Sequence, residues 1–460
     1  MIAIISVAKI KGTYTSPLQS EVLRIKTSTD LIIKNLVDGE HSGKALEIIE
    51  AISYKFGPRL LGSQPLESAL TYVSEMMKKD GFENVVLETV PNVTHWVRGE
   101  ESLKMTQPRE AEIVMLGLGG SVATPPEGIT APIILINSFE ELEVRKDEVQ
   151  GKIVLYNYNS TFTSYGQLSK YRTRGASQAS KFGAVASLVR SLASFSMRTP
   201  HTGVMYYEKS VTKIPGAAVS VEDADMITWL IKHGENVVVT LKMNCQDLSP
   251  AISHNVYGDI VGSKYPDEII VVGGHMDSWD VGTGANDDLG GAIVCYQAIK
   301  TIVQLGLKPL RTLRFIGWTG EEWGSAGATQ YRLNHLDQLK NHVFAFESDS
   351  GVFSPSGISL ATRSNSTTNV VSMIVNVLCK DLNTTIIRSV GCESIGQDTK
   401  ELCAEGITTA HPITESHKYM WYHHSHADTP YSMNNGDLDK MTAMISAIIY
   451  AVANLENRLN

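Results

Sequence analysis

The chain has few cysteines and no long hydrophobic run. Its five cysteines, among 460 residues, form no Cys-x-x-Cys pair, so the sequence does not indicate a disulfide-rich scaffold. No apolar segment reaches the roughly 18 residues that cross a bilayer. The best candidate, Met441–Leu455, is expected to be a core helix. We therefore predict no membrane span.

Positive charge is also scarce. Forty Lys and Arg residues stand against 49 Asp and Glu residues, which gives a formal net charge of −9. No basic cluster offers a surface that could follow phosphates, so a nucleic-acid partner is not expected. Hydrophobic residues make up 43% of the chain and only 16 residues are proline, which excludes a disordered or collagenous polymer. The length favours two domains, or one domain with a large insertion.

Residues 1–40 are interpreted as an N-terminal segment that carries the remnant of a signal-like sequence. The apolar stretch Ile2–Ala8 lacks a preceding basic region and is short for the core of a signal peptide. From Ser42 onward, apolar residues follow helical spacing up to Gly57-Pro58, where the helix is expected to end.

The remainder reads as an α/β protein interrupted by a different kind of segment. A helix over 66–79 and a strand over 85–90 open it, and after residue 248 apolar strands alternate with helices. Those later strands are expected at 268–272, 312–317 and 343–347, and the helices at 290–303, 324–336 and 370–382. Between them, strands such as 131–136 and 152–156 alternate with turn-rich stretches. We predict a mixed, mostly parallel sheet sandwiched by helices, formed by 41–107 and 248–460, with 108–247 as an inserted domain.

Acidic residues or histidine follow three of these strands at once. His275 ends the first of them, Glu321 and Glu322 follow the second, and Asp349 follows the third. Because ligand sites lie beyond the carboxyl ends of parallel strands, we expect these side chains to converge at one edge of the sheet. The loop after His275 is rich in glycine, which lets it fold back and bring Asp287 near.

A fourth group, His423-His424-Ser425-His426, comes from near the C-terminus. Imidazoles mixed with carboxylates suit Zn²⁺, and more than four of them indicate two metal ions that share a carboxylate. Taken alone, each of the four groups of acidic residues and histidines has an ordinary explanation, such as a helix cap or a solvated loop. Together, they would place several charges at one edge of the sheet, and a cation relieves the repulsion between them.

Four sequence strings carry a resemblance to a known family: GGHMDSWDVGTGANDD, GWTGEEWG, ESDSG and HHSHADT. They resemble the di-zinc exopeptidases, which include bacterial aminopeptidases and glutamate carboxypeptidases. The similarity extends to GPRLLGS, TPPEGITA, GKIVLYN and PHTG, and so covers nearly the whole chain from Ala45. It implies a zinc exopeptidase fold, an inserted domain similar to a protease-associated domain, and a cis peptide bond between Asp287 and Asp288.

The resemblance also implies a ligand set for two Zn²⁺ ions per chain. One ion would bind His275 and Asp349, and the other would bind Glu322 and His424. Asp287 would bridge the two ions.

The catalytic roles follow from the same resemblance. Glu321 would be the general base for a hydroxide that bridges the two zinc ions, and Asp277 would orient the imidazole of a zinc ligand. His424 is preferred among the C-terminal histidines because the family's ligand stands four residues before an Asp-Thr pair, whose aspartate is Asp428 here. His423 and His426 are weaker candidates.

The family resemblance points to small peptides as substrates, above all dipeptides with both termini free, and to a homodimer. It also points to a secreted or lysosomal location, which agrees with four N-glycosylation triplets, at Asn92, Asn159, Asn365 and Asn383. Two alternatives remain: an aminopeptidase acting on longer peptides, and a receptor-like relative without catalysis. The presence of all five expected ligands and Glu321 argues against the receptor.

Three features near the expected site have two interpretations. The residues that recognise the substrate's termini are not evident from the sequence. Asp398 is interpreted as a helix N-cap, although it resembles a family position near the site. Tyr419, Trp421 and Tyr422 either line a pocket or pack in the core.

Overall fold

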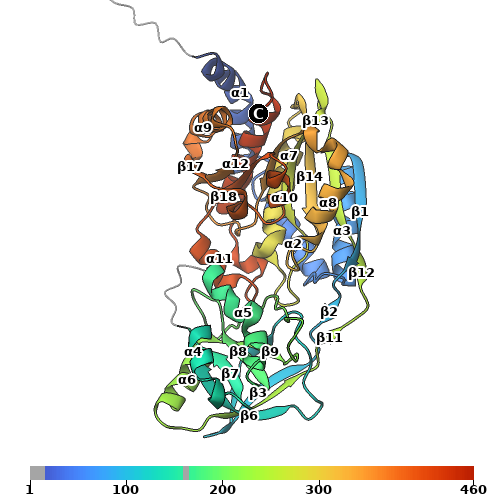
Figure 1. Cartoon of the computed structure of the whole chain (residues 1–460). Coiled ribbons are helices and arrows are strands. Elements are labelled where there is room, and N and C mark those ends of the chain that lie inside the picture. Colours follow the sequence, from blue (N-terminus) through green and yellow to red (C-terminus); the bar gives the residue numbers. More distant parts are fainter. Residues whose placement is uncertain (1–15, 159–164, 460) are drawn as a thin grey trace, which may run out of the picture.

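The computed structural model describes residues 16–158 and 165–459. Most of its strands form two eight-stranded sheets. In Figure 1 the sheet that contains β13 and β14 lies, with its helices, above the sheet that contains β6 and β7. A pair of two-residue strands, β2 (Trp96–Val97) and β11 (Gln246–Asp247), joins the two parts. The expected apolar stretch Ile2–Ala8 and the triplet at Asn159 lie outside the described residues.

The first sheet has the order β1-β12-β14-β13-β15-β18-β16-β17. Its strands are β1 (Glu83–Val93), β12 (Ala251–Ile260), β13 (Tyr265–His275), β14 (Arg311–Trp318), β15 (His342–Glu347), β16 (Gly357–Ala361), β17 (Ile386–Ser389) and β18 (Thr408–Ile413). In its centre, β13 runs parallel to both β14 and β15, and β15 runs parallel to β18. The outer pairs β1–β12, β12–β14 and β16–β18 are antiparallel. The predicted fold class, a mixed and mostly parallel sheet, is confirmed.

Helices cover both faces of this sheet because its central strands are apolar on both sides. Along β13, Ile270 and Val272 face one hydrophobic cluster, whereas Ile269 and Val271 face another. The first cluster includes residues of α2 (Lys44–Phe56), α3 (Gln64–Lys79), α7 (Gly290–Gln304), α9 (Asn365–Leu378) and α12 (Asn435–Ala453). The second includes residues of α8 (Ala326–Asn334) and α10 (Lys400–Ala404). This period-two alternation is the pattern of a strand buried on both faces.

The expected core helix near the C-terminus is present as α12, which is buried along nearly its whole length. Across the described residues, none of the helices combines the length and the apolar character that a membrane crossing requires. Helix α9 begins five residues earlier than predicted, where the side chain of Ser364 caps it by accepting a hydrogen bond from the amide of Thr367.

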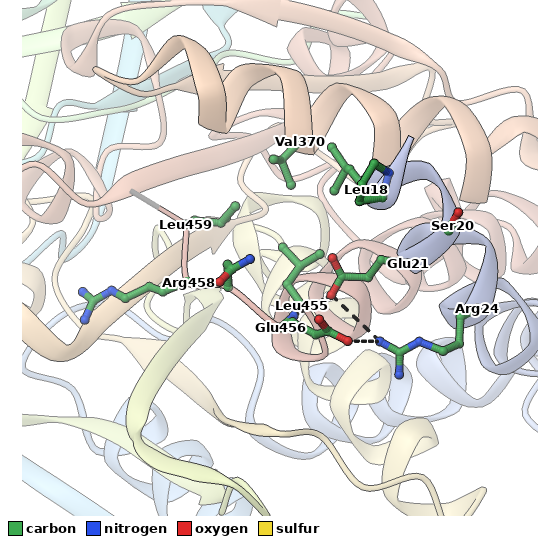
Figure 2. A pocket seen from close by; sticks show the side chains of 11 residues that line it. Leu18, Ser20, Glu21, Arg24, Val370, Leu455, Glu456, Arg458 and Leu459 are labelled. Carbon is green, nitrogen blue, oxygen red and sulfur yellow. Dashed lines mark hydrogen bonds and ion pairs between the residues drawn. The ribbon is translucent and has the colours of Figure 1, made fainter. Parts of the chain in front are cut away.

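The described part of residues 1–40 forms a helix of the main core, and the signal-like interpretation, which rests on Ile2–Ala8, stays a prediction. Helix α1 (Pro17–Val37) packs Val22, Ile32 and Leu36 into the main core. Arg24 of this helix forms an ion pair of 3.3 Å with Glu456 of the C-terminal segment, and Figure 2 shows the two side chains facing each other. A cavity of about 610 Å³ lies between α1 and that segment, and no predicted site residue lines it. The buried residues of α1 follow helical spacing, with Thr29 as the polar member of the stripe.

The second sheet has the order β4-β3-β10-β6-β7-β8-β9-β5. Its strands are β3 (Glu101–Gln107), β4 (Ala111–Ile113), β5 (Met115–Gly117), β6 (Ile129–Ile136), β7 (Ile153–Tyr156), β8 (Ala186–Arg190), β9 (Gly216–Val219) and β10 (Val238–Met243), and the helices in this part are α4 (Phe139–Val144), α5 (Tyr165–Ser180) and α6 (Val221–Lys232). Strand β3 precedes residue 108, yet it pairs with β4 and β10. The sheet therefore extends across the predicted boundary at 108, and the division into an inserted domain stays a prediction.

Candidate metal centre

The central strands bring the predicted donors to one edge of the first sheet. Strand β13 ends at His275, opposite Trp318 of β14, and its Gly273 lies opposite Glu347 of β15. Glu321 follows Trp318 by three residues, and Asp349 follows Glu347 by two. Because these strands are parallel neighbours, the residues that follow them emerge side by side.

Asp287 lies between two histidines that come from distant parts of the chain. Its Oδ1 is 3.3 Å from Nε2 of His275, and its Oδ2 is 3.2 Å from Nε2 of His424. Asp349 lies on the His275 side, with Oδ1 4.0 Å from the same Nε2, and Glu322 lies on the His424 side, with Oε2 2.9 Å from Nε2. The donors thus form two groups that meet at Asp287.

The chemistry of this donor set fits zinc. Among the described residues, His275 Nε2, Asp287 Oδ2 and Glu322 Oε1 are buried without a hydrogen-bond partner. Buried polar atoms are nearly always paired, so these three point to a cation. Imidazole nitrogens and carboxylate oxygens are the ligands of zinc sites that lack cysteine. All five predicted ligands are placed where they can take part in such a site.

Burial and the neighbouring histidines shift the pKa values of the carboxylates at this site. Burial raises the pKa of Asp349 to about 7, although the charge of His275 opposes the shift. Burial also raises the pKa of Glu322, against the opposing effect of His424. For Asp287, contacts with the two histidines outweigh burial and hold its pKa well below the usual range. Asp349 and Glu322 would thus release protons when a metal ion binds, whereas Asp287 is already ionised.

Asp277 contacts the site in two ways. Its backbone carbonyl lies 2.9 Å from Nδ1 of His275, whereas its carboxylate oxygen Oδ1 is 3.6 Å from that nitrogen. The same Oδ1 accepts hydrogen bonds from the backbone amides of Gly320 and Glu321, at 2.8 and 3.2 Å. Asp277 therefore contacts the imidazole through its main chain and binds the segment that carries Glu321 through its side chain.

The loop that carries Asp287 is held by residues to which the sequence analysis assigns no supporting role. The peptide bond between Asp287 and Asp288 is cis, as the family resemblance implies. Asp428 accepts a hydrogen bond from the backbone amide of Asp287, at 3.1 Å. The indole of Trp279 donates to Oε2 of Glu322, at 2.6 Å. A hydrogen bond to a metal-binding carboxylate orients it, so Trp279 supports the second group of donors.

Among the other histidines, His423 also reaches the site and His426 does not. His423 Nε2 is 3.7 Å from Oδ2 of Asp287, and its ring stacks on that of His424 at 3.5 Å between centroids. His424 Nδ1 lies 3.2 Å from the carbonyl of Thr202, which belongs to the part of the chain containing the second sheet. His426 is exposed and does not line the pocket.

A pocket of about 380 Å³ opens over these donors. Arg172 of α5 is the one Lys or Arg among its lining residues, and its side chain is buried. Its Nη1 donates to the hydroxyl of Tyr165 at 2.6 Å, and its Nε has no hydrogen-bond partner among the described residues. Arg172 was not predicted, because nothing in the local sequence distinguishes it from a surface arginine.

Two further expectations are settled by the packing. Tyr419 lines the pocket, with its hydroxyl 3.4 Å from Oδ1 of Asp349. Trp421 and Tyr422 do not line it. The N-cap interpretation of Asp398 is wrong, since α10 begins after Thr399. Asp398 is instead fully buried, and burial raises its pKa well above the usual range.

Comparison with known proteins identifies the family. The pattern of Peptidase family M28 matches residues 255–449, which contain all the predicted donors. Human carboxypeptidase Q is 40% identical over 442 residues, which is 96% of this chain and 92% of that protein. The chain belongs to peptidase family M28. The mouse carboxypeptidase Q is 39% identical over the same length. The expected family and the expected class of enzyme, a metallopeptidase, are thereby confirmed.

Solved structures of peptidases share this fold. The crystal structure of a peptidase M28 precursor from Shewanella amazonensis has a TM-score of 0.88 at 30% identity, over 95% of this chain and 99% of that chain. A zinc aminopeptidase from Bacillus subtilis has a TM-score of 0.65 at 20% identity, over 88% of this chain and 93% of that chain, a likeness that concerns the fold alone.

Proposed function

We propose that this M28 peptidase is an exopeptidase that uses two zinc ions per chain and hydrolyses small peptides, above all dipeptides with both termini free. The observation that carries the proposal is the position of Asp287, whose two carboxylate oxygens face His275 and His424. His275 and Asp349 would hold one ion, Glu322 and His424 would hold the other, and Asp287 would serve both.

When bound, zinc polarises the scissile carbonyl and lowers the pKa of a water molecule. Glu321 is the carboxylate in the pocket that is left to move protons. Its Oε2 is 3.9 Å from Nε2 of His275, and burial raises its pKa well above the usual range although His275 opposes the shift. A carboxylate with a raised pKa can accept a proton from the attacking water and release it to the leaving amine near neutral pH. This supports Glu321 as the general base.

The pocket also supports a short substrate with a free carboxylate. Its volume of about 380 Å³ lies at the lower end of the range of small-molecule sites. Arg172 is its one lining cation, and a guanidinium suits a carboxylate better than an amine. A free carboxyl terminus is therefore expected in the substrate, and the assay of the blocked forms tests whether the amino terminus must also be free.

The test is hydrolysis of one dipeptide in three forms: unblocked, blocked at the amino terminus and blocked at the carboxyl terminus. Each form is assayed with added zinc and with a chelator. We expect chelator-sensitive cleavage of the unblocked form only. Cleavage of the form with a blocked carboxyl terminus would favour an aminopeptidase. No cleavage of any form with zinc present would favour a receptor-like relative.

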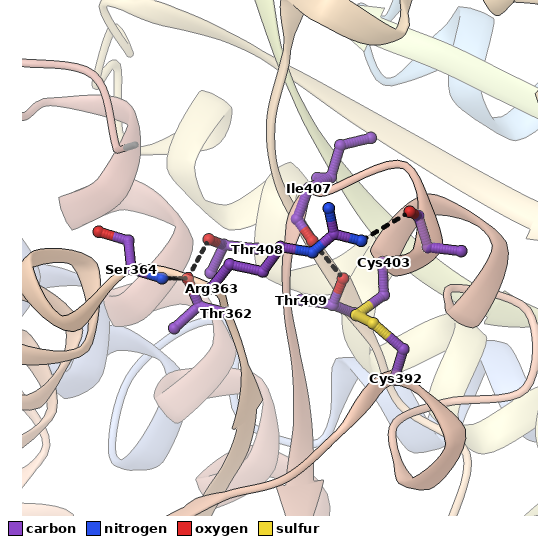
Figure 3. The surroundings of a disulfide bond; sticks show 9 residues. Thr362, Arg363, Ser364, Cys392, Cys403, Ile407, Thr408 and Thr409 are labelled. Carbon is purple, nitrogen blue, oxygen red and sulfur yellow. Dashed lines mark hydrogen bonds between the residues drawn. A yellow bond between two sulfur atoms is a disulfide. The ribbon is translucent and has the colours of Figure 1, made fainter.

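We also propose that the chain passes through the secretory route. The described asparagines of the N-glycosylation triplets, Asn92, Asn365 and Asn383, are all exposed. Cys392 and Cys403 form a disulfide bond, shown in Figure 3, and such bonds persist in oxidising compartments. Loss of mass on treatment of the secreted protein with a glycosidase is the measurement.

The homodimer stays a prediction, for which the mass of the native protein in solution is the test.

A further inference from the structure

A buried arginine lies beneath the loop that joins two of the metal donors. Arg59 belongs to the connection between α2 and α3, and its side chain is fully buried. Its Nε donates to the carbonyl of Met276 at 2.7 Å, and its Nη1 and Nη2 donate to the carbonyls of Thr283 and Gly284 at 2.6 and 3.0 Å. One guanidinium therefore binds three carbonyls of the same loop.

The positions of these carbonyls relate Arg59 to the donors. Met276 follows His275 directly, and Gly284 precedes Asp287 by three residues. The guanidinium thus connects the beginning and the end of the loop whose flanks carry both donors. A planar group with donors that point in several directions can do this, whereas the single ammonium of lysine cannot reach carbonyls on both sides.

The backbone of Arg59 is bound to the same loop. Its amide donates to the hydroxyl of Ser278 at 2.9 Å, and its carbonyl accepts from the amide of Ser278 at 3.0 Å. Its Nη1 also donates to the carbonyl of Gly57, in its own segment, at 3.2 Å. The loop is therefore attached to the start of the α2–α3 connection through both main chain and side chain.

Arg59 also brings a positive charge to a region crowded with carboxylates. Burial lowers its pKa to about 10, while Asp428 and Asp277 favour the charged form. A pKa of about 10 keeps the guanidinium protonated at neutral pH. None of the ion pairs found among the described residues includes Arg59, so its charge is not committed to a single carboxylate.

We propose that Arg59 is a positioning residue of the metal centre, which sets the placement of His275 relative to Asp287 by holding both ends of the loop between them. This inference rests on the zinc sites proposed above. A buried arginine that only packs would stabilise the fold equally with and without metal. A positioning residue changes the affinity for zinc, and loss of an outer partner of a metal ligand typically weakens metal binding about 10- to 100-fold.

The experiment compares Arg59→Lys with a matched control, Arg311→Lys, in the full chain. Arg311 is also buried and donates to a backbone carbonyl, that of Leu455, but it begins β14, at the opposite end of the strand from the metal centre. Zinc affinity is measured by competition with a chelator, and the melting temperature is measured with and without zinc. For Arg59→Lys we expect zinc affinity to fall by at least tenfold and the rise in melting temperature on adding zinc to shrink. For Arg311→Lys we expect zinc affinity within twofold of the wild type and equal drops in both melting temperatures.

Each outcome decides the inference. A folded Arg59→Lys protein with wild-type zinc affinity would overturn it. If Arg59→Lys does not fold, Ser278→Ala removes the hydroxyl that binds the Arg59 amide and leaves the arginine in place. We expect this variant to bind zinc more weakly than the wild type, and unchanged affinity would overturn the inference. A wild-type protein that binds no zinc would instead refute the proposed function.

Discussion

The carboxylate of Asp428 accepts a hydrogen bond from the backbone amide of Asp287, at 3.1 Å. Its other oxygen accepts from the backbone amide of Asn286, at 2.7 Å. Asp428 follows His424 by four residues, so one C-terminal segment both contributes a donor to the metal centre and holds the residue that lies between the two donor groups. The two halves of the centre are therefore coupled through Asp428.

Replacing Asp428 by asparagine should weaken this coupling. The amide keeps one acceptor oxygen and turns an NH₂ group toward one of the two backbone amides. Leaving a buried donor unpaired costs about 1 to 3 kcal/mol. We expect a loss of that size in the free energy of unfolding, together with weaker zinc binding, measured by denaturant unfolding and chelator competition. Asp267→Asn, at an exposed site, is the control. Equal zinc affinity in the two variants would contradict the role of Asp428.

Most of the predicted donors that the structure brings together lie next to strong strand patterns. His275, Glu321, Glu322 and Asp349 each follow a continuous apolar strand, and the rule for parallel sheets brings such residues to one edge. The position of His424 came from the family resemblance and not from a pattern. Local periodicity and one topological rule were thus sufficient to predict that most of these side chains lie close together.

The residues that surround the donors could not be predicted from the sequence, and the reason is physical. Arg59 and Arg172 act through contacts with segments more than 20 residues away, and nothing in their local sequence indicates a partner. The disulfide between Cys392 and Cys403 could not be predicted either, because five cysteines allow many pairings. Helix α1 was not predicted, because residues 1–40 were interpreted as a signal-like remnant. These features depend on tertiary packing, which the sequence pattern does not encode locally.

Glu321→Gln should separate metal binding from catalysis. The substitution keeps the size of the side chain and removes its ability to accept a proton. General-base catalysis contributes about 10²- to 10⁴-fold, so we expect kcat to fall within that range while zinc content is unchanged. Metal analysis and steady-state kinetics on an unblocked dipeptide are the measurements. Glu235→Gln, at an exposed position, should leave both values unaltered. A Glu321→Gln enzyme with near-normal kcat would remove Glu321 as the base.

Asp287→Ala should affect both metal ions, whereas single-sided variants should affect one. Asp287 faces both histidines, so its loss removes a ligand from each group of donors. We expect dialysed Asp287→Ala protein to retain fewer zinc ions than either His275→Ala or His424→Ala, each of which should keep about one ion per chain. Zinc per chain is measured by elemental analysis after dialysis against a weak chelator. Retention of two zinc ions by Asp287→Ala would refute the bridging role.

The stability of the chelated protein should fall as the pH rises from about 4 to 7. Burial raises the pKa of both Asp349 and Asp428 to about 7, from an ordinary value of 3.8. Within that window the folded protein binds more protons than the unfolded chain, so the free energy of unfolding decreases with increasing pH. Above pH 7 these two carboxyls are ionised in both states, and their contribution to the slope ends.

Zinc should weaken this trend, because a metal ion takes the place of the bound proton at Asp349, whereas Asp428 is not one of the proposed ligands. Thermal unfolding between pH 4.5 and 7.5, with zinc and with a chelator, is the measurement. Asp349→Asn cannot ionise at that position, so its chelated form should show a shallower dependence on pH than the wild type. Chelated wild-type protein that gains stability over this range would mean that the carboxyls are not held protonated by burial, and the crowding inferred at the metal centre would be wrong.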